Sequence, residues 1–114
     1  MDNYEYSELL KTITIKMENI TGVIEPDKIQ TRLDEIKELE NGSEFWNDAA
    51  AAAVIQKEKT QLERKLKKYQ NVKNSVEDAK DLYELAKAEN DEDTINECFE
   101  SAGELEALVL SMEI

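Results

Sequence analysis

The fold is decided by the stretch Asn47–Asn90, which reads NDAAAAAVIQKEKTQLERKLKKYQNVKNSVEDAKDLYELAKAEN. It contains no Pro and no Gly, and nearly every residue in it favours a helix. At 1.5 Å of rise per residue, such a helix would be about 65 Å long. Its apolar residues recur mostly at steps of three and four, which places them in one stripe along one face. The stripe consists of Ile55, Leu62, Leu66, Tyr69, Val72, Val76, Ala79, Tyr83 and Ala86.

A helix this long with so narrow an apolar stripe is not stable alone, so we expect other helices to pack along it. Three further segments have helical spacing: Tyr4–Ile20, Pro26–Glu40, and a last segment that follows the acidic turn at residues 91–93. Gly22 can take a left-handed conformation that ends the first of these, and Pro26 suits the first position of the second.

Polar residues mark the expected starts of the two later helices. Asn47 or Asp48 can cap the long helix, and Asp91 or Asp93 can cap the last one. The turns before these two helices are short, so each should join antiparallel neighbours.

The lengths of these segments predict the architecture. The second helix should lie along the first half of the long helix, and the fourth along its second half. The first helix can continue past the second, which places three helices around Tyr69–Ala86 and only two around Ala49–Leu62. A simple hairpin of the first two helices is the alternative layout.

The expected fold class is therefore all-α: an elongated antiparallel helical bundle, or coiled coil, of four helices built on one long helix. We expect a single helical domain over residues 1–114. The apolar pattern is still running at Ile114 with no stop signal, so we also expect the chain to be part of a longer protein.

Charge is unevenly distributed along the chain. The net charge is −13, yet residues 57–73 hold seven basic residues and only two acidic ones. One interpretation is a solvated helix face; the other is a surface that binds nucleic-acid phosphate. The acidic flanks argue against free-standing binding to DNA or RNA, because long-range repulsion would oppose approach. We define the candidate basic band as Lys57, Lys59, Arg64, Lys65, Lys67 and Lys68.

The sequence offers little for catalysis or cofactor binding. It has no His and only one cysteine, Cys98, which lies on an apolar stripe and suits a structural role. It shows no phosphate-binding loop, metal-ligand motif or cysteine pair, so we expect no enzyme activity, no cofactor and no metal site. No apolar run of 18 residues occurs, so we expect no membrane span. The single Cys98 cannot form an internal disulfide, so we expect a cytoplasmic protein.

Two adjacent aromatic residues, Phe45 and Trp46, lie in the connector before the long helix. We expect them to fold back as a buried apolar plug against the second helix and the first turn of the third. The alternative is an exposed site that binds a partner.

The order of the segments resembles the N-terminal domain of the bacterial peptide chain release factor 2 family. The similar features are the LDEIKELE helix, the Phe45-Trp46-Asn47-Asp48 connector, the QKEKTQLE and EDAKDLYELA segments, and the acidic turn before the last helix. The Trp in the connector favours factor 2 over factor 1.

The resemblance implies a module that contacts the ribosome at the base of the large-subunit stalk, in the GTPase-associated centre. Full-length members of the family read the stop codons UGA and UAA and trigger hydrolysis of peptidyl-tRNA through a Gly-Gly-Gln loop. Neither the codon-reading tripeptide nor Gly-Gly-Gln occurs in this chain. The alternative from another class is a free-standing helical adaptor that pairs with other coiled coils.

Overall fold

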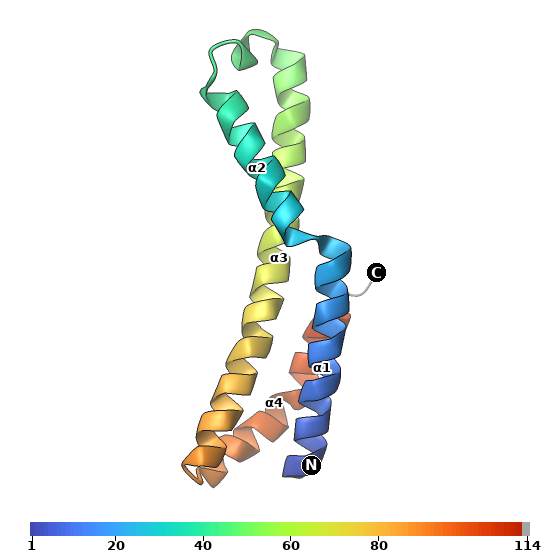
Figure 1. Ribbon diagram of the computed structural model, residues 1–114, viewed down its shortest axis with the longest axis vertical. Helices are drawn as coiled ribbons and strands as arrows, with labels where there is room; N and C mark the ends of the chain where they lie inside the picture. Colours follow the sequence, from blue (N-terminus) through green and yellow to red (C-terminus); the bar gives the residue numbers. More distant parts are fainter. Residues whose placement is uncertain (113–114) are drawn as a thin grey trace. The chain divides into compact units, whose positions relative to one another are not determined.

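The computed structural model describes residues 1–112, which form four α-helices and one 3₁₀ turn, with no strand in this range. In chain order the elements are α1 (Asn3–Ile24), α2 (Pro26–Asn41), η1 (Phe45–Asn47), α3 (Ala49–Ala88) and α4 (Glu92–Leu110) (Figure 1). The predicted all-α fold is confirmed, and α3, at 40 residues, is the long helix around which the sequence is organised.

The helices divide into two compact units that share α3. The three-helix unit comprises Met1–Val23 and Gln70–Ile114, and the two-helix unit comprises Ile24–Tyr69. In Figure 1, α1 and α4 accompany the yellow-to-orange half of α3, whereas α2 accompanies its green half. This arrangement matches the expected three helices around the later half of α3 and two around the earlier half, with α1 and α2 in different units. The single domain over residues 1–114 stays a prediction.

The core of the three-helix unit takes side chains from all three helices. Its buried aliphatic residues follow the helical spacing that the sequence shows, and Ala79 at the edge of the stripe is only half-buried. The buried residues are Tyr6, Leu10, Ile13, Met17 and Ile20 of α1; Val72, Val76, Tyr83 and Ala86 of α3; Ile95, Cys98, Ala102, Leu105 and Val109 of α4; and Met112.

Three aromatic rings from three helices meet within this core. The ring of Tyr6 lies 4.6 Å from that of Tyr83 and 5.6 Å from that of Phe99, with centroids at distances typical of favourable edge-to-face or tilted pairs. The Tyr83 hydroxyl donates a hydrogen bond to Oδ1 of Asn3 at 2.8 Å, so the buried phenol has a polar partner. Burial, with the nearby Cys98 thiol, raises the pKa of Tyr6 to about 12.

The core of the two-helix unit is much smaller. Its buried side chains are few, and the stripe residues Ile55 and Leu62 are only half-buried, because α2 is the only helix of this unit that packs on this half of α3. The buried residues are Ile24, Ile29 and Ile36 on one side and Ala52, Leu66 and Tyr69 of α3 on the other. Polar bridges between α2 and α3, described below, supplement this apolar contact.

The helix starts agree with the expected caps. Oδ1 of Asp48 accepts from the Ala51 backbone N–H at 3.1 Å, and Oδ1 of Asp91 accepts from the Thr94 N–H at 3.1 Å. Each carboxylate satisfies an N–H group that the first turn of a helix leaves unpaired.

The left-handed break expected at Gly22 is wrong. α1 continues through Gly22 to Ile24, whose side chain is buried, and no glycine of the described residues has a positive φ. The break falls instead at Glu25, with φ 53° and ψ 63°. Glu25 precedes Pro26, and a proline disfavours the right-handed helical conformation in the residue before it. The proline, rather than the glycine, therefore sets the boundary.

The Tyr83 hydrogen bond gives a first prediction. Tyr83→Phe keeps the packed ring and removes only the hydroxyl, so it should lower the free energy of unfolding by about 1 kcal/mol. Urea denaturation measures this change. Tyr4→Phe is the matched control, because Tyr4 is 73% exposed and should change stability by less than about 0.5 kcal/mol. Equal stability of the two variants would contradict a structural role for the bond.

Candidate functional site

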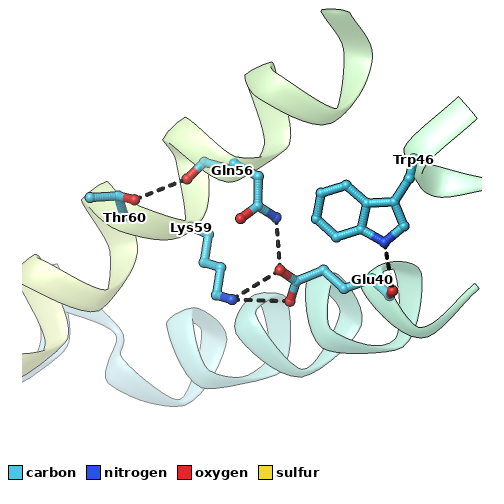
Figure 2. Close-up of polar contacts among 5 residues, drawn as sticks. All are labelled: Glu40, Trp46, Gln56, Lys59 and Thr60. Carbon is cyan, nitrogen blue, oxygen red and sulfur yellow. Dashed lines mark hydrogen bonds and ion pairs between the residues drawn. The ribbon is translucent and has the colours of Figure 1, made fainter. Parts of the chain in front are cut away.

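A polar network ties the end of α2 to the start of α3. The carboxylate of Glu40 accepts hydrogen bonds from the Gln56 amide at 2.8 Å and from the Lys59 ammonium at 3.0 and 3.1 Å. Figure 2 shows these two donors of α3 facing Glu40, while the Trp46 indole lies over the end of α2. The indole Nε1 donates to the backbone carbonyl of Glu40 at 3.1 Å. Glu40 of α2 is thus hydrogen-bonded both to the connector and to α3.

A second bridge lies further along the same two helices. The guanidinium of Arg32 holds both carboxylate oxygens of Glu58, at 2.9 and 2.8 Å, and also contacts Glu35 at 3.2 Å. This two-point geometry orients the α2–α3 pair more strictly than a single contact would. Arg32 and Glu40 were not predicted as bridging residues; the available signal in the sequence was a charged residue beside the apolar stripe of each helix.

The two carboxylates that bridge α2 and α3, those of Glu40 and Glu58, both have lowered pKa values. Hydrogen bonds from Gln56 and Lys59 hold the pKa of Glu40 below its ordinary value of 4.5. The guanidinium of Arg32 similarly holds the pKa of Glu58 below 4.5, and Glu58 and Glu35 raise the pKa of Arg32. Both acids are therefore stabilised in their charged forms in the folded protein.

The candidate basic band does not form one surface. Lys57, Arg64 and Lys68 are seven and eleven residues apart, close to two and three full turns, so they share one face of α3. That face is opposite the stripe that contains Ala52 and Leu66, which are buried in the two-helix unit. We call these three residues the outer basic face. The other two exposed residues of the candidate basic band, Lys65 and Lys67, flank the outer basic face on either side.

Lys59 departs from the prediction. Its ammonium is ion-paired with Glu40, and the two side chains are only 33% and 17% exposed. The charge of Lys59 is therefore used within the protein and is not available to phosphate. By contrast, within residues 1–112 no ion pair involves Lys57 or Arg64, both of which are exposed.

The expected burial of the connector aromatics is wrong for Trp46, whose side chain is 55% exposed. Phe45 is half-buried, and its ring meets the indole edge-on at 4.6 Å. The connector does fold back onto α2 as expected, but through the indole N–H bond to Glu40 and not through a buried plug. The short η1 turn brings the indole to the rim of the small core, where no third helix of this unit covers it.

Residues 1–112 contain neither a candidate metal site nor a candidate membrane span. Within the described residues, no group of three or more His, Cys, Asp or Glu side chains is placed to hold a metal ion. Across the same residues, none of the helices combines the length and the apolar character needed to cross a lipid bilayer.

The chain belongs to the PCRF domain family, whose pattern matches residues 29–113. Over all 114 residues it is also similar to proteins named peptide chain release factor 2: it is 61% identical to that of Sulfurimonas denitrificans, 54% to that of Nitratiruptor sp. and 50% to that of Campylobacter jejuni. The resemblance noted from the sequence is confirmed. The chain covers 31% of the length of each of these relatives.

The exposed position of Trp46 predicts a small effect on stability. Trp46→Ala should lower the free energy of unfolding by about 1 kcal/mol, because the ring is only partly buried, compared with 3–5 kcal/mol typical of a fully buried Trp. Trp46→Phe, which retains a ring but loses the N–H bond to Glu40, should lie between Trp46→Ala and the parent. A loss above about 3 kcal/mol in urea denaturation would show that the indole is buried in solution.

The lowered pKa values of Glu40 and Glu58 predict a dependence of stability on pH. Because each folded-state pKa lies below the ordinary 4.5, the stabilisation is fully present above that pH and is lost as the pH falls through the folded-state values. The free energy of unfolding should therefore decline on acidification. The double variant Glu40→Gln/Glu58→Gln should be less stable near neutral pH and show a shallower decline.

The matched control for this experiment is Glu18→Gln/Glu38→Gln, which changes two exposed glutamates that make no ion pair within residues 1–112. Its pH profile, measured by urea denaturation at a series of pH values, should follow that of the parent. Parallel profiles for the two double variants would show that the α2–α3 bridges do not contribute.

Proposed function

We propose that this chain is the ribosome-contacting N-terminal module of a class I peptide chain release factor of the factor 2 type, which in its full length directs termination at UGA and UAA. The observation that carries the proposal is 61% identity across the whole chain to a protein named peptide chain release factor 2. A free-standing coiled-coil adaptor would have no reason to share the PCRF pattern over residues 29–113.

In this proposal the chain positions the factor and does not perform the chemistry. The 114 residues contain neither His nor a Gly-Gly-Gln loop, and peptidyl-tRNA hydrolysis is assigned to another part of the full-length factor. The contact site is the base of the large-subunit stalk, at the GTPase-associated centre, and the compartment is the cytoplasm. The module needs no cofactor, membrane or free DNA.

The proposed contact surface is the outer basic face. Lys57, Arg64 and Lys68 are exposed on one face of α3, which gives a straight row of cations for a phosphate backbone. Because the chain as a whole is strongly acidic, this is the segment where ribosomal RNA would be attracted and not repelled. Lys65 and Lys67 extend the positive potential on either side of the row.

The division of labour is tested with a peptide release assay on ribosomes programmed with UGA. The isolated 114-residue chain should give no release above background. The full-length factor should release the peptide, and the factor lacking this module should bind ribosomes more weakly. Release by the isolated chain would contradict the assignment of the chemistry to other domains.

The contact surface is tested by reversing its charge in the full-length factor. Lys57→Glu/Arg64→Glu/Lys68→Glu should weaken ribosome binding, and each lost phosphate contact should reduce the slope of log affinity against log salt by about one unit. The control is Lys11→Glu/Lys37→Glu/Lys73→Glu, which makes the same change in net charge at exposed lysines outside the face. Equal losses in the two triple variants would contradict a specific role for this face.

A further inference from the structure

The three-helix unit carries a groove that the proposed function does not use. It lies between α3 and α4 and has a volume of about 330 Å³. Ala79 and Leu82 of α3 and Leu105 and Leu108 of α4 supply its apolar lining. Leu82 and Leu108 remain 45% and 38% exposed. Two partly exposed leucines on facing helices give an apolar surface that suits the side chains of a docked segment.

The charged residues that line the groove are all acidic. Glu97 and Glu104, seven residues apart on one face of α4, line it, and no Lys or Arg does. Neither glutamate takes part in an ion pair among residues 1–112. The lysines of this half of α3 recur every seven residues on another face, and one of them, Lys80, lines a separate groove against α1.

We propose that this groove docks a basic amphipathic helix of a partner protein. Leucine-sized side chains of that helix would enter between Leu82 and Leu108, and its Lys or Arg residues would pair with Glu97 and Glu104. Apolar grooves on helical proteins commonly bind a helix in this way, through residues spaced three, four and seven apart. The paired charges fix the orientation and the choice of partner.

The same charges disfavour the other occupants. A second copy of this chain carries a net charge of −13 and the same acidic groove, so self-association would bring like charges together. RNA and anionic lipid would be repelled by Glu97 and Glu104 for the same reason. A basic protein segment is the macromolecule whose charge and apolar stripe both match the groove.

The test uses the isolated 114-residue chain and three synthetic helical peptides of about 18 residues, or five turns. The first has a leucine stripe flanked by lysines, the second has the same stripe flanked by glutamates, and the third keeps the lysines but replaces the leucines with serines. Fluorescence anisotropy measures binding. The first peptide should bind about tenfold or more tightly than either of the others, because only it satisfies both features.

Protein variants then locate the binding site. Glu97→Lys/Glu104→Lys should weaken binding of the first peptide about tenfold, as should Leu82→Ser/Leu108→Ser. The control Glu77→Lys/Glu89→Lys makes the same change in net charge at exposed glutamates that do not line the groove, and it should bind nearly as tightly as the parent. Circular dichroism shows whether each variant is folded, and NMR shift changes in the parent should cluster at Ala79, Leu82 and Leu108.

Four results would overturn the proposal. Equal weakening by the groove and control charge reversals, or equal binding of the first and third peptides, would show a general attraction of a basic peptide to an acidic protein. No binding of the first peptide to the folded parent would show that the groove accepts no such helix. A dimer seen by analytical ultracentrifugation and lost in Leu82→Ser/Leu108→Ser would show that a second copy covers it.

Discussion

The apolar stripe along α3 is the feature on which both units depend. A helix of 40 residues cannot be stable alone in water when only one narrow face is apolar, so each part of the stripe requires a covering helix. From Val72 to Ala86 the stripe is covered by α1 and α4, and the aromatic rings of Tyr6, Tyr83 and Phe99 fill the space between the three helices. The remaining contacts of the fold follow from how this stripe is covered.

Where only α2 covers the stripe, polar contacts carry more of the specificity. Two helices bury a thin layer of aliphatic side chains, and such a layer alone would allow the helices to slide or rotate. The Arg32–Glu58 pair and the Glu40–Lys59 pair hold the register between α2 and α3 at two points. Both pairs are partly exposed, so their individual contribution to stability is modest, and their main effect is geometric. The fixed register keeps the outer basic face directed away from α2.

Most of the fold could be predicted from the sequence because its signals are local. Helical spacing, the caps at Asp48 and Asp91, and short turns are set by neighbouring residues, and they gave the helices and their pairing. The two failures have different causes. Gly22 stays helical because a glycine permits a left-handed break without requiring one, and Glu25, the residue before Pro26, takes that break instead. Trp46 stays exposed because the unit is only two helices wide.

For the candidate basic band, the sequence predicts which residues are present but not how they are arranged in space. The sequence showed a cluster of cations, but not that Lys59 would be taken by Glu40, which is 19 residues away along the chain. Sorting the cluster into the ion-paired Lys59 and the exposed Lys57 and Arg64 requires knowing which face of α3 meets α2. The apolar groove between α3 and α4 was missed for a similar reason, since Leu82 and Leu108 lie at the edges of their stripes and not in them.

The charge distribution constrains how the proposed contact surface, the outer basic face, would bind RNA. At physiological ionic strength, screening limits electrostatic attraction to about 8 Å, so Lys57, Arg64 and Lys68 act only once the surfaces are close. The rest of the chain carries the excess of acidic residues behind the net charge of −13, so it adds no attraction to RNA as the surfaces approach. The outer basic face is therefore suited to orienting a protein that is already held nearby, and it is poorly suited to recruiting it. In the two proposals taken together, docking of a basic helix in the acidic groove holds the chain in place, and the outer basic face orients it at short range.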